Sequence, residues 1–188
     1  GCRLFQEKMK HIFKTTLITV SILFLFTSKI FATGAGIQAG LIPGLFINET
    51  SSSVKNLTGN ITGTIRMSKF PVVAGAGFEG GKLFSDFNYG FSVFADYWAV
   101  DLQIKNTWSF YSGFGFSGKL LTSDFKKWNF AAGARFFAGT NYTFYDNFLE
   151  LYAQQNIVPT YIKSLTSSGN DGMFMFCFPF EAGLRMHF

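Results

Sequence analysis

The segment from Phe174 to Phe188, FMFCFPFEAGLRMHF, alternates with a period of two up to its last residue. Every second residue from Phe174 onward is apolar, whereas the intervening positions carry the charges of the segment, Glu181 and Arg185. A period of two is typical of a β-strand, because successive side chains point to opposite faces. This strand could belong to a soluble sandwich, with the apolar face buried, or to a membrane barrel, with that face in lipid.

The amino-acid composition favours the membrane barrel. The chain of 188 residues is 48% hydrophobic and contains 26 Phe, but only 14% of its residues are charged. Soluble domains carry about 25% charged residues, whereas a wall that contacts lipid has little use for charge. The length suits one domain and one closed barrel. A Phe-rich soluble β domain is the competing interpretation at this point.

Residues 1–32 are predicted to be an N-terminal extension and a cleaved signal peptide. A basic start at 9–14 is followed by an apolar run at 15–26, which has the length of a signal-peptide core. A membrane-spanning helix needs about 20 apolar residues, which is longer than this run. Cleavage after Ala32 would leave residues 33–188 as one outer-membrane β-barrel domain.

Removal of residues 1–32 changes the charge balance. They hold five of the 16 Lys and Arg residues and one of the 11 Asp and Glu residues, so the net charge falls from +5 to +1. No basic patch remains that would indicate nucleic-acid binding. Cys177 is the single cysteine of residues 33–188, which excludes an intramolecular disulfide there. One cysteine and one distant histidine, His187, give no metal-site spacing, and we expect neither a metal nor another cofactor.

The rest of the chain predicts an all-β fold, an eight-stranded antiparallel up-and-down transmembrane barrel. Polar loops are expected at four places, and shorter turns or connections separate the other strands. Even strand numbers and long loops at one end are typical of outer-membrane barrels. Pro179 removes a donor from the ladder, so we expect regular pairing of the last strand to stop there. The predicted strands are 35–46, 60–67, 72–80, 89–99, 107–118, 128–139, 148–157 and 174–188; the predicted loops are 48–57, 81–87, 119–127 and 163–172, and the connections are 68–71, 100–106 and 140–147.

Seven charged residues inside the predicted strands lie in the phase opposite the dominant apolar residues. A basic residue on the lipid face at the bilayer midplane costs roughly 2–4 kcal/mol, so we place the charged phase inside the barrel. Four acids and three bases suit a lumen of paired charges better than a wide pore. A lipocalin-like soluble barrel would need the inverse pattern. The seven residues are Arg66, Glu79, Asp96, Arg135, Glu150, Glu181 and Arg185.

Aromatic residues near the ends of the predicted strands also favour a membrane. Trp and Tyr are enriched at the two membrane–water interfaces. The residues predicted to form these belts are Tyr89, Tyr97, Trp98, Trp108 and Trp128.

The last nine residues, FEAGLRMHF, resemble the assembly signal of bacterial outer-membrane proteins, with Phe180, Leu184, Met186 and Phe188 as its apolar positions. From about Ala35 onward the chain resembles small eight-stranded barrels of the OmpA-transmembrane or OmpW-like kind. It looks most like a family of small spirochaete outer-membrane barrels. The motifs that carry this resemblance are WSFYSGFG at 108–115, NFAAGAR at 129–135, FLELY at 148–152 and FPFEAGLRMHF at 178–188.

The resemblance implies a non-enzymatic protein of the bacterial outer membrane, assembled by the barrel-assembly machinery and monomeric. Its structural role would be membrane integration, and any recognition of an extracellular ligand would lie in the loops, because loops vary while the scaffold holds. A narrow, porin-like channel for ions or small apolar molecules is the alternative. A lipid-modifying enzyme is the third hypothesis. It is disfavoured because His187 has no evident acid or nucleophile beside it in the sequence.

Overall fold

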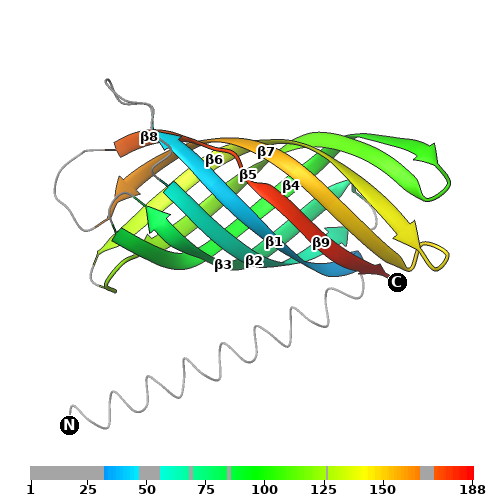
Figure 1. Cartoon of the computed structure of the whole chain (residues 1–188), viewed down its shortest axis with the longest axis horizontal. Coiled ribbons are helices and arrows are strands. Elements are labelled where there is room, and N and C mark those ends of the chain that lie inside the picture. The colour runs from blue at the N-terminus through cyan, green and yellow to red at the C-terminus, as the bar shows by residue number, and fades with distance from the viewer. Residues whose placement is uncertain (1–31, 47–55, 68–69, 84–85, 126, 166–171) are drawn as a thin grey trace, which may run out of the picture.

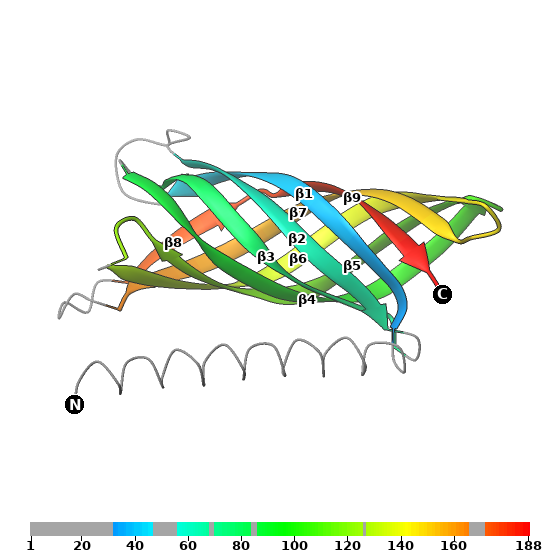
Figure 2. The same cartoon turned by 90° about the horizontal axis from the view of Figure 1, so that it is seen from below.

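The protein is described by a computed structural model that covers residues 32–46, 56–67, 70–83, 86–125, 127–165 and 172–188. Within these residues no helix is long and apolar enough to cross a membrane. The described chain is a tilted ring of antiparallel strands (Figures 1 and 2). The strands are β1 (Ala32–Phe46), β2 (Asn56–Met67), β3 (Val72–Leu83), β4 (Asp86–Lys105), β5 (Trp108–Thr122), β6 (Trp128–Phe144), β7 (Leu149–Ser164), β8 (Gly172–Cys177) and β9 (Phe180–His187).

The ring closes between the two ends of the described chain. β1 pairs with β2 on one side and with β8 and β9 on the other, and β7 also pairs with both β8 and β9. β8 and β9 therefore together occupy a single strand position between β7 and β1. The barrel thus has the eight strand positions that the sequence predicts. We call the end with Ala32 and His187 the terminal end, and the opposite end, with Phe46 and Asn56, the loop end.

Regular pairing of the last strand stops at Pro179, as the sequence predicts. The interruption comprises Phe178 and Pro179, which belong to neither β8 nor β9. The ladder adapts on both sides, because the Phe178 amide donates to the Pro43 carbonyl at 2.9 Å and the Asn156 amide donates to the Pro179 carbonyl at 2.8 Å. A residue that lacks an amide donor is thus accommodated without loss of ring closure.

Most strands are longer than the sequence predicts. The prediction of a loop at 81–87 is wrong, because β3 continues to Leu83 and β4 begins at Asp86. The predicted loop at 119–127 shortens, since β5 ends at Thr122. β2 begins four residues early, whereas β6 and β7 extend to Phe144 and Ser164. Most of the predicted loops 48–57 and 163–172 lies outside the described residues.

The predicted connection at 100–106 is wrong for a specific reason. The register of β4 against β5 shifts between Trp98 and Val100, so one extra residue forms a bulge in β4. After the bulge Val100 and Leu102 pair with Ser112 and Phe110 on the outer face, and a second register shift lies between Gln103 and Lys105. The apolar residues therefore change phase by one position at the bulge. A strict period of two predicts that the strand ends at Ala99, although it continues to Lys105.

The two faces of the wall differ as the alternation predicts. In the last strand Phe180, Leu184 and Met186 are 54%, 44% and 47% exposed, whereas Glu181 and Arg185 are buried. The outer faces of the other strands carry exposed apolar side chains in the same way, among them Ile37, Ile61, Phe78, Phe91, Phe116, Phe136 and Ile157. An apolar outer wall around a polar interior is the arrangement that a lipid bilayer requires.

Inward-facing glycines make room for large interior side chains. A Cβ atom on Gly139 would lie 2.7 Å from the Tyr111 hydroxyl oxygen, and one on Gly183 would lie 2.6 Å from the Tyr152 hydroxyl oxygen. Both tyrosines are buried in the barrel interior. The glycines are therefore needed for close approach, because a barrel of eight strands has space for little beyond its own side chains.

Candidate functional site

The middle of the barrel interior is organised around Arg135 of β6. Its Nε donates to Asp96 Oδ1 at 2.8 Å, and its Nη2 donates to Asp96 Oδ2 at 3.1 Å and to Glu181 Oε2 at 2.9 Å. The guanidinium also lies over the ring of Phe94, 4.5 Å from the centroid. β4, β6 and β9 supply the three charges, so closure of the ring is what brings them together.

Amide side chains complete this central cluster. One cation faces two carboxylates, and the second carboxylate, Glu181, accepts further bonds from Gln154 at 2.8 Å, Asn156 at 3.0 Å and Asn60 at 3.3 Å. Gln154 in turn accepts from the hydroxyl of Tyr111. A buried charge is stable only when its hydrogen-bonding capacity is met, and these amides meet it.

A second cluster occupies the terminal end and centres on Glu150 of β7. Its carboxylate receives hydrogen bonds from Arg185 Nη1 at 3.0 Å and Asn141 Nδ2 at 2.8 Å, and His187 Nε2 lies 2.7 Å from its Oε2. The guanidinium of Arg185 lies over the ring of Tyr152, 4.5 Å from the centroid. This cluster binds β6, β7 and β9 to one another at the end where the described chain stops.

A third ion pair lies toward the loop end. Lys119 Nζ is 2.7 Å from Glu79 Oε2, and the Thr58 hydroxyl donates to Glu79 Oε1 at 3.0 Å. Lys119 was not predicted as an interior residue, because the sequence places it in a loop. The period-two alternation of β5 continues beyond Phe116, and this pattern would have placed Lys119 in the interior phase.

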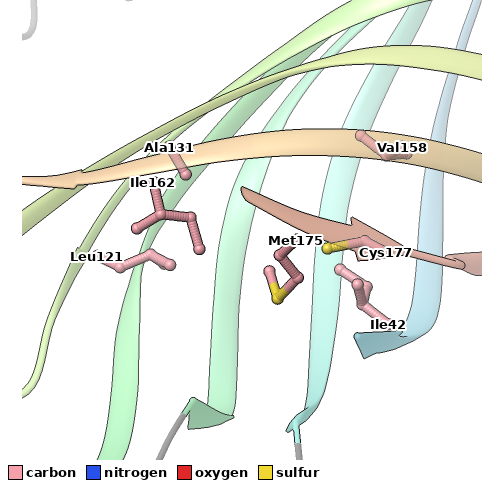
Figure 3. Close-up of a cluster of buried hydrophobic side chains, with 7 residues drawn as sticks. All are labelled: Ile42, Leu121, Ala131, Val158, Ile162, Met175 and Cys177. Carbon is pink, nitrogen blue, oxygen red and sulfur yellow. The ribbon is translucent and has the colours of Figure 1, made fainter. Parts of the chain in front are cut away.

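A cluster of apolar side chains lies in the interior beside the Glu79–Lys119 pair. Figure 3 shows these inward side chains, which are all buried and come from β1, β5, β6, β7 and β8. The charge pattern predicts a lumen of paired charges and gives no indication of these apolar residues. We call these residues the apolar layer: Ile42, Leu121, Ala131, Val158, Ile162, Met175 and Cys177.

Little free space remains between the layers. Two cavities beside the Glu79–Lys119 pair have volumes of ≈ 20 Å³ and ≈ 10 Å³, about the space for one water molecule each. A wider recess of ≈ 270 Å³ lies at the terminal end and is lined by Asp101, Asn141 and His187 among others. Within the described residues the interior therefore holds charged and apolar layers and no wide pore.

The structure brings most of the predicted lumen charges together in pairs. Glu79, Asp96, Arg135, Glu150, Glu181 and Arg185 are buried inside the barrel. Arg66 is half-buried and pairs at 3.5 Å with the more exposed Asp101, a residue of the mispredicted connection. Its guanidinium lies 4.3 Å from the centroid of the Trp98 ring.

Two single-residue predictions need correction. Trp98 was predicted to lie in an interfacial belt, but it is buried in the interior and stacks on Tyr111, with ring centroids 4.0 Å apart. His187 has the partner Glu150, although none was evident in the sequence, because the partner lies on the neighbouring strand. Of the predicted belt, Tyr97 and Trp108 are exposed on the outer face.

No group of three or more His, Cys, Asp or Glu that could hold a metal occurs among the described residues.

Comparisons with known proteins give structural relatives only. Neither a protein-family model nor a curated protein matches the chain. Neisserial surface protein A (NspA) superposes with a TM-score of 0.54 at 14% identity, over 82% of this chain and 96% of that one. The N-terminal β-barrel domain of Pseudomonas aeruginosa OprF aligns at 12% identity and a TM-score of 0.48, over 83% and 99% of the two chains. Ail of Yersinia pestis aligns at 13% identity and a TM-score of 0.42, over 82% and 99%. The match to NspA and the closed ring of eight strand positions show that the chain has the fold of the small eight-stranded outer-membrane β-barrels.

Proposed function

We propose that this protein is an integral barrel of a bacterial outer membrane, without enzymatic activity, that recognises an extracellular partner through its loop end. The observation that carries the proposal is the contrast between the two faces of the wall. The outer face is apolar from β1 to β9, whereas the inner face carries buried ion pairs. Such a wall is stable in lipid and would be unstable with its outer face in water.

The filled interior supports a role at the surface over a role in transport. Three ion-pair clusters fill the barrel, and the apolar layer packs around one of them, so a solute would have to displace paired charges to pass. Recognition is then left to the segments that connect the strands. At the loop end these are residues 47–55, 84–85, 123–127 and 165–171.

The surroundings of His187 support the absence of catalysis. Its Nε2 is engaged by Glu150, and its Nδ1 faces the backbone of β1 at Gly34, where a Cβ atom would lie 3.0 Å away. A hydrolytic triad would instead present one ring nitrogen to a nucleophile. We expect His187→Ala to leave lipid turnover by the refolded protein at the background level of the wild type. Turnover by the wild type that the variant loses would contradict this part of the proposal.

Membrane integration is tested by refolding the chain into detergent and comparing boiled and unboiled samples by gel electrophoresis. A folded barrel migrates differently from the boiled chain, and we expect such a shift. A chain that stays monomeric and soluble without detergent, with no shift, would overturn the proposal.

Recognition is tested separately with bacteria that display the barrel on their surface. Replacing residues 47–55 and 166–171 by Gly-Ser segments of equal length should abolish adhesion to an epithelial cell monolayer and leave the gel shift unchanged. The matched control replaces residues 145–148 at the terminal end, which should leave adhesion intact. Equal adhesion by all three forms would remove the recognition role and leave membrane integration standing.

A further inference from the structure

The outer wall carries a groove near the terminal end. Thr140 of β6, Ala153 of β7 and Ala182 of β9 are direct neighbours in the ladder, so three small outward side chains form one continuous row. Larger side chains follow on the next row, where Tyr142, Leu151 and Leu184 are likewise neighbours. The resulting groove has a volume of ≈ 570 Å³, within the range of about 300–1,000 Å³ that is usual for small-molecule sites.

One end of the groove is formed by the β4–β5 hairpin. Lys105 and Trp108 face each other in the register of these strands and both line the groove. The indole of Trp108 donates a hydrogen bond to the Thr140 hydroxyl, which fixes the ring at the end of the row. Trp is enriched at membrane–water interfaces, and a Lys there lays its apolar stem on the wall and its ammonium group in the headgroup region.

We propose that this groove binds one anionic phospholipid of the leaflet at the terminal end, with an acyl chain along Thr140, Ala153 and Ala182. The lipid phosphate then lies at Lys105. A narrow groove in a lipid-facing wall fits a flexible apolar chain, and the one basic residue at its end is complementary to a phosphate. The proposal goes beyond recognition at the loop end and rests on membrane integration.

The test measures lipid retention by native mass spectrometry of barrels refolded with phosphatidylglycerol or phosphatidylcholine. Lys105→Glu should lower phosphatidylglycerol retention about fivefold, because one basic residue at an anionic lipid surface is worth about 1 kcal/mol. Ala182→Phe fills the groove and should lower retention of both lipids. Lys82→Glu and Ala95→Phe are the controls. They change an exposed Lys and an outward Ala elsewhere on the wall and should retain lipid as the wild type does.

The gel shift is recorded for every variant, so that a failure of integration is distinguished from a failure of lipid binding. If the wild type and every variant show the gel shift and retain the two lipids equally, the proposal is overturned. A wild-type dimer that Ala182→Phe converts to a monomer would also overturn it, because the groove would then contact a second copy of the chain.

Discussion

Arg135 is the residue on which the middle of the interior depends, because it is the cation between Asp96 and Glu181. Arg135→Met keeps much of the side-chain volume and leaves two buried carboxylates without a cation. Breaking a buried pair in this way costs about 3–5 kcal/mol. We expect a correspondingly lower free energy of unfolding, measured by urea titration of the barrel in lipid vesicles.

Arg66→Met is the matched control for this prediction. The Arg66–Asp101 pair is longer, at 3.5 Å, and partly exposed, so its loss should cost about 0–1 kcal/mol. Equal losses for the two variants would contradict the view that the buried cluster, more than surface pairing, stabilises the barrel.

Gly139 tests whether the interior glycines are needed for close approach. A Cβ atom there would lie 2.6 Å from both the Ala153 carbonyl oxygen and the Tyr111 ring, so Gly139→Ala should destabilise the barrel by about 1–3 kcal/mol, the usual cost of overpacking. Gly63→Ala is the control, because the nearest atom to its Cβ position is 3.8 Å away. Tyr111→Leu in the Gly139→Ala background should recover part of the loss. Lack of recovery would show that the cost has another origin.

Side-chain phases could be predicted from the sequence at the residue scale, whereas interior partners could not. The charges of β7 and β9 lie in the interior phase because a lipid face excludes them, and this holds for each strand alone. The pairing of Glu150 with His187, or of Glu79 with Lys119, depends on strand register and on closure of the ring. Those properties belong to the whole sheet and have no local sequence signal.

Strand lengths show the same limit at the scale of the element. The predicted strands end at Gly80, Ala99 and Gly118, next to a Gly pair, a bulge and a basic residue, but the hydrogen-bonded ladder passes all three positions. Cross-strand partners supply the missing information, since each extension is paired with a neighbour. Pro179 was located correctly because its missing amide is a property of the residue itself.

The terminal strand makes a separate prediction about assembly. Phe188 is 79% exposed, so Phe188→Ala should leave the free energy of unfolding of the refolded barrel nearly unchanged. If the residue is part of an assembly signal, the variant should still lower the amount of heat-modifiable barrel in the outer membrane of producing cells. Phe114→Ala, which changes an outward Phe of β5, is the control and should assemble normally. Normal assembly of the Phe188 variant would remove the residue from the signal.

At the scale of the whole molecule, the interior is closed by two barriers. The apolar layer packs around the Glu79–Lys119 pair and leaves cavities of only ≈ 20 Å³ and ≈ 10 Å³, and the cluster around Arg135 blocks the passage because its charges are paired and buried. The wild-type barrel should therefore show no single-channel steps in a planar bilayer. Leu121→Ser with Ile162→Ser opens only the apolar layer, and Arg135→Ser with Glu181→Ser opens only the charged cluster, so each pair should also stay silent. Current steps are expected when the four substitutions are combined in barrels that retain the gel shift. Steps from the wild type would favour the channel over the surface role, and steps from either pair alone would show that the other barrier does not close the barrel.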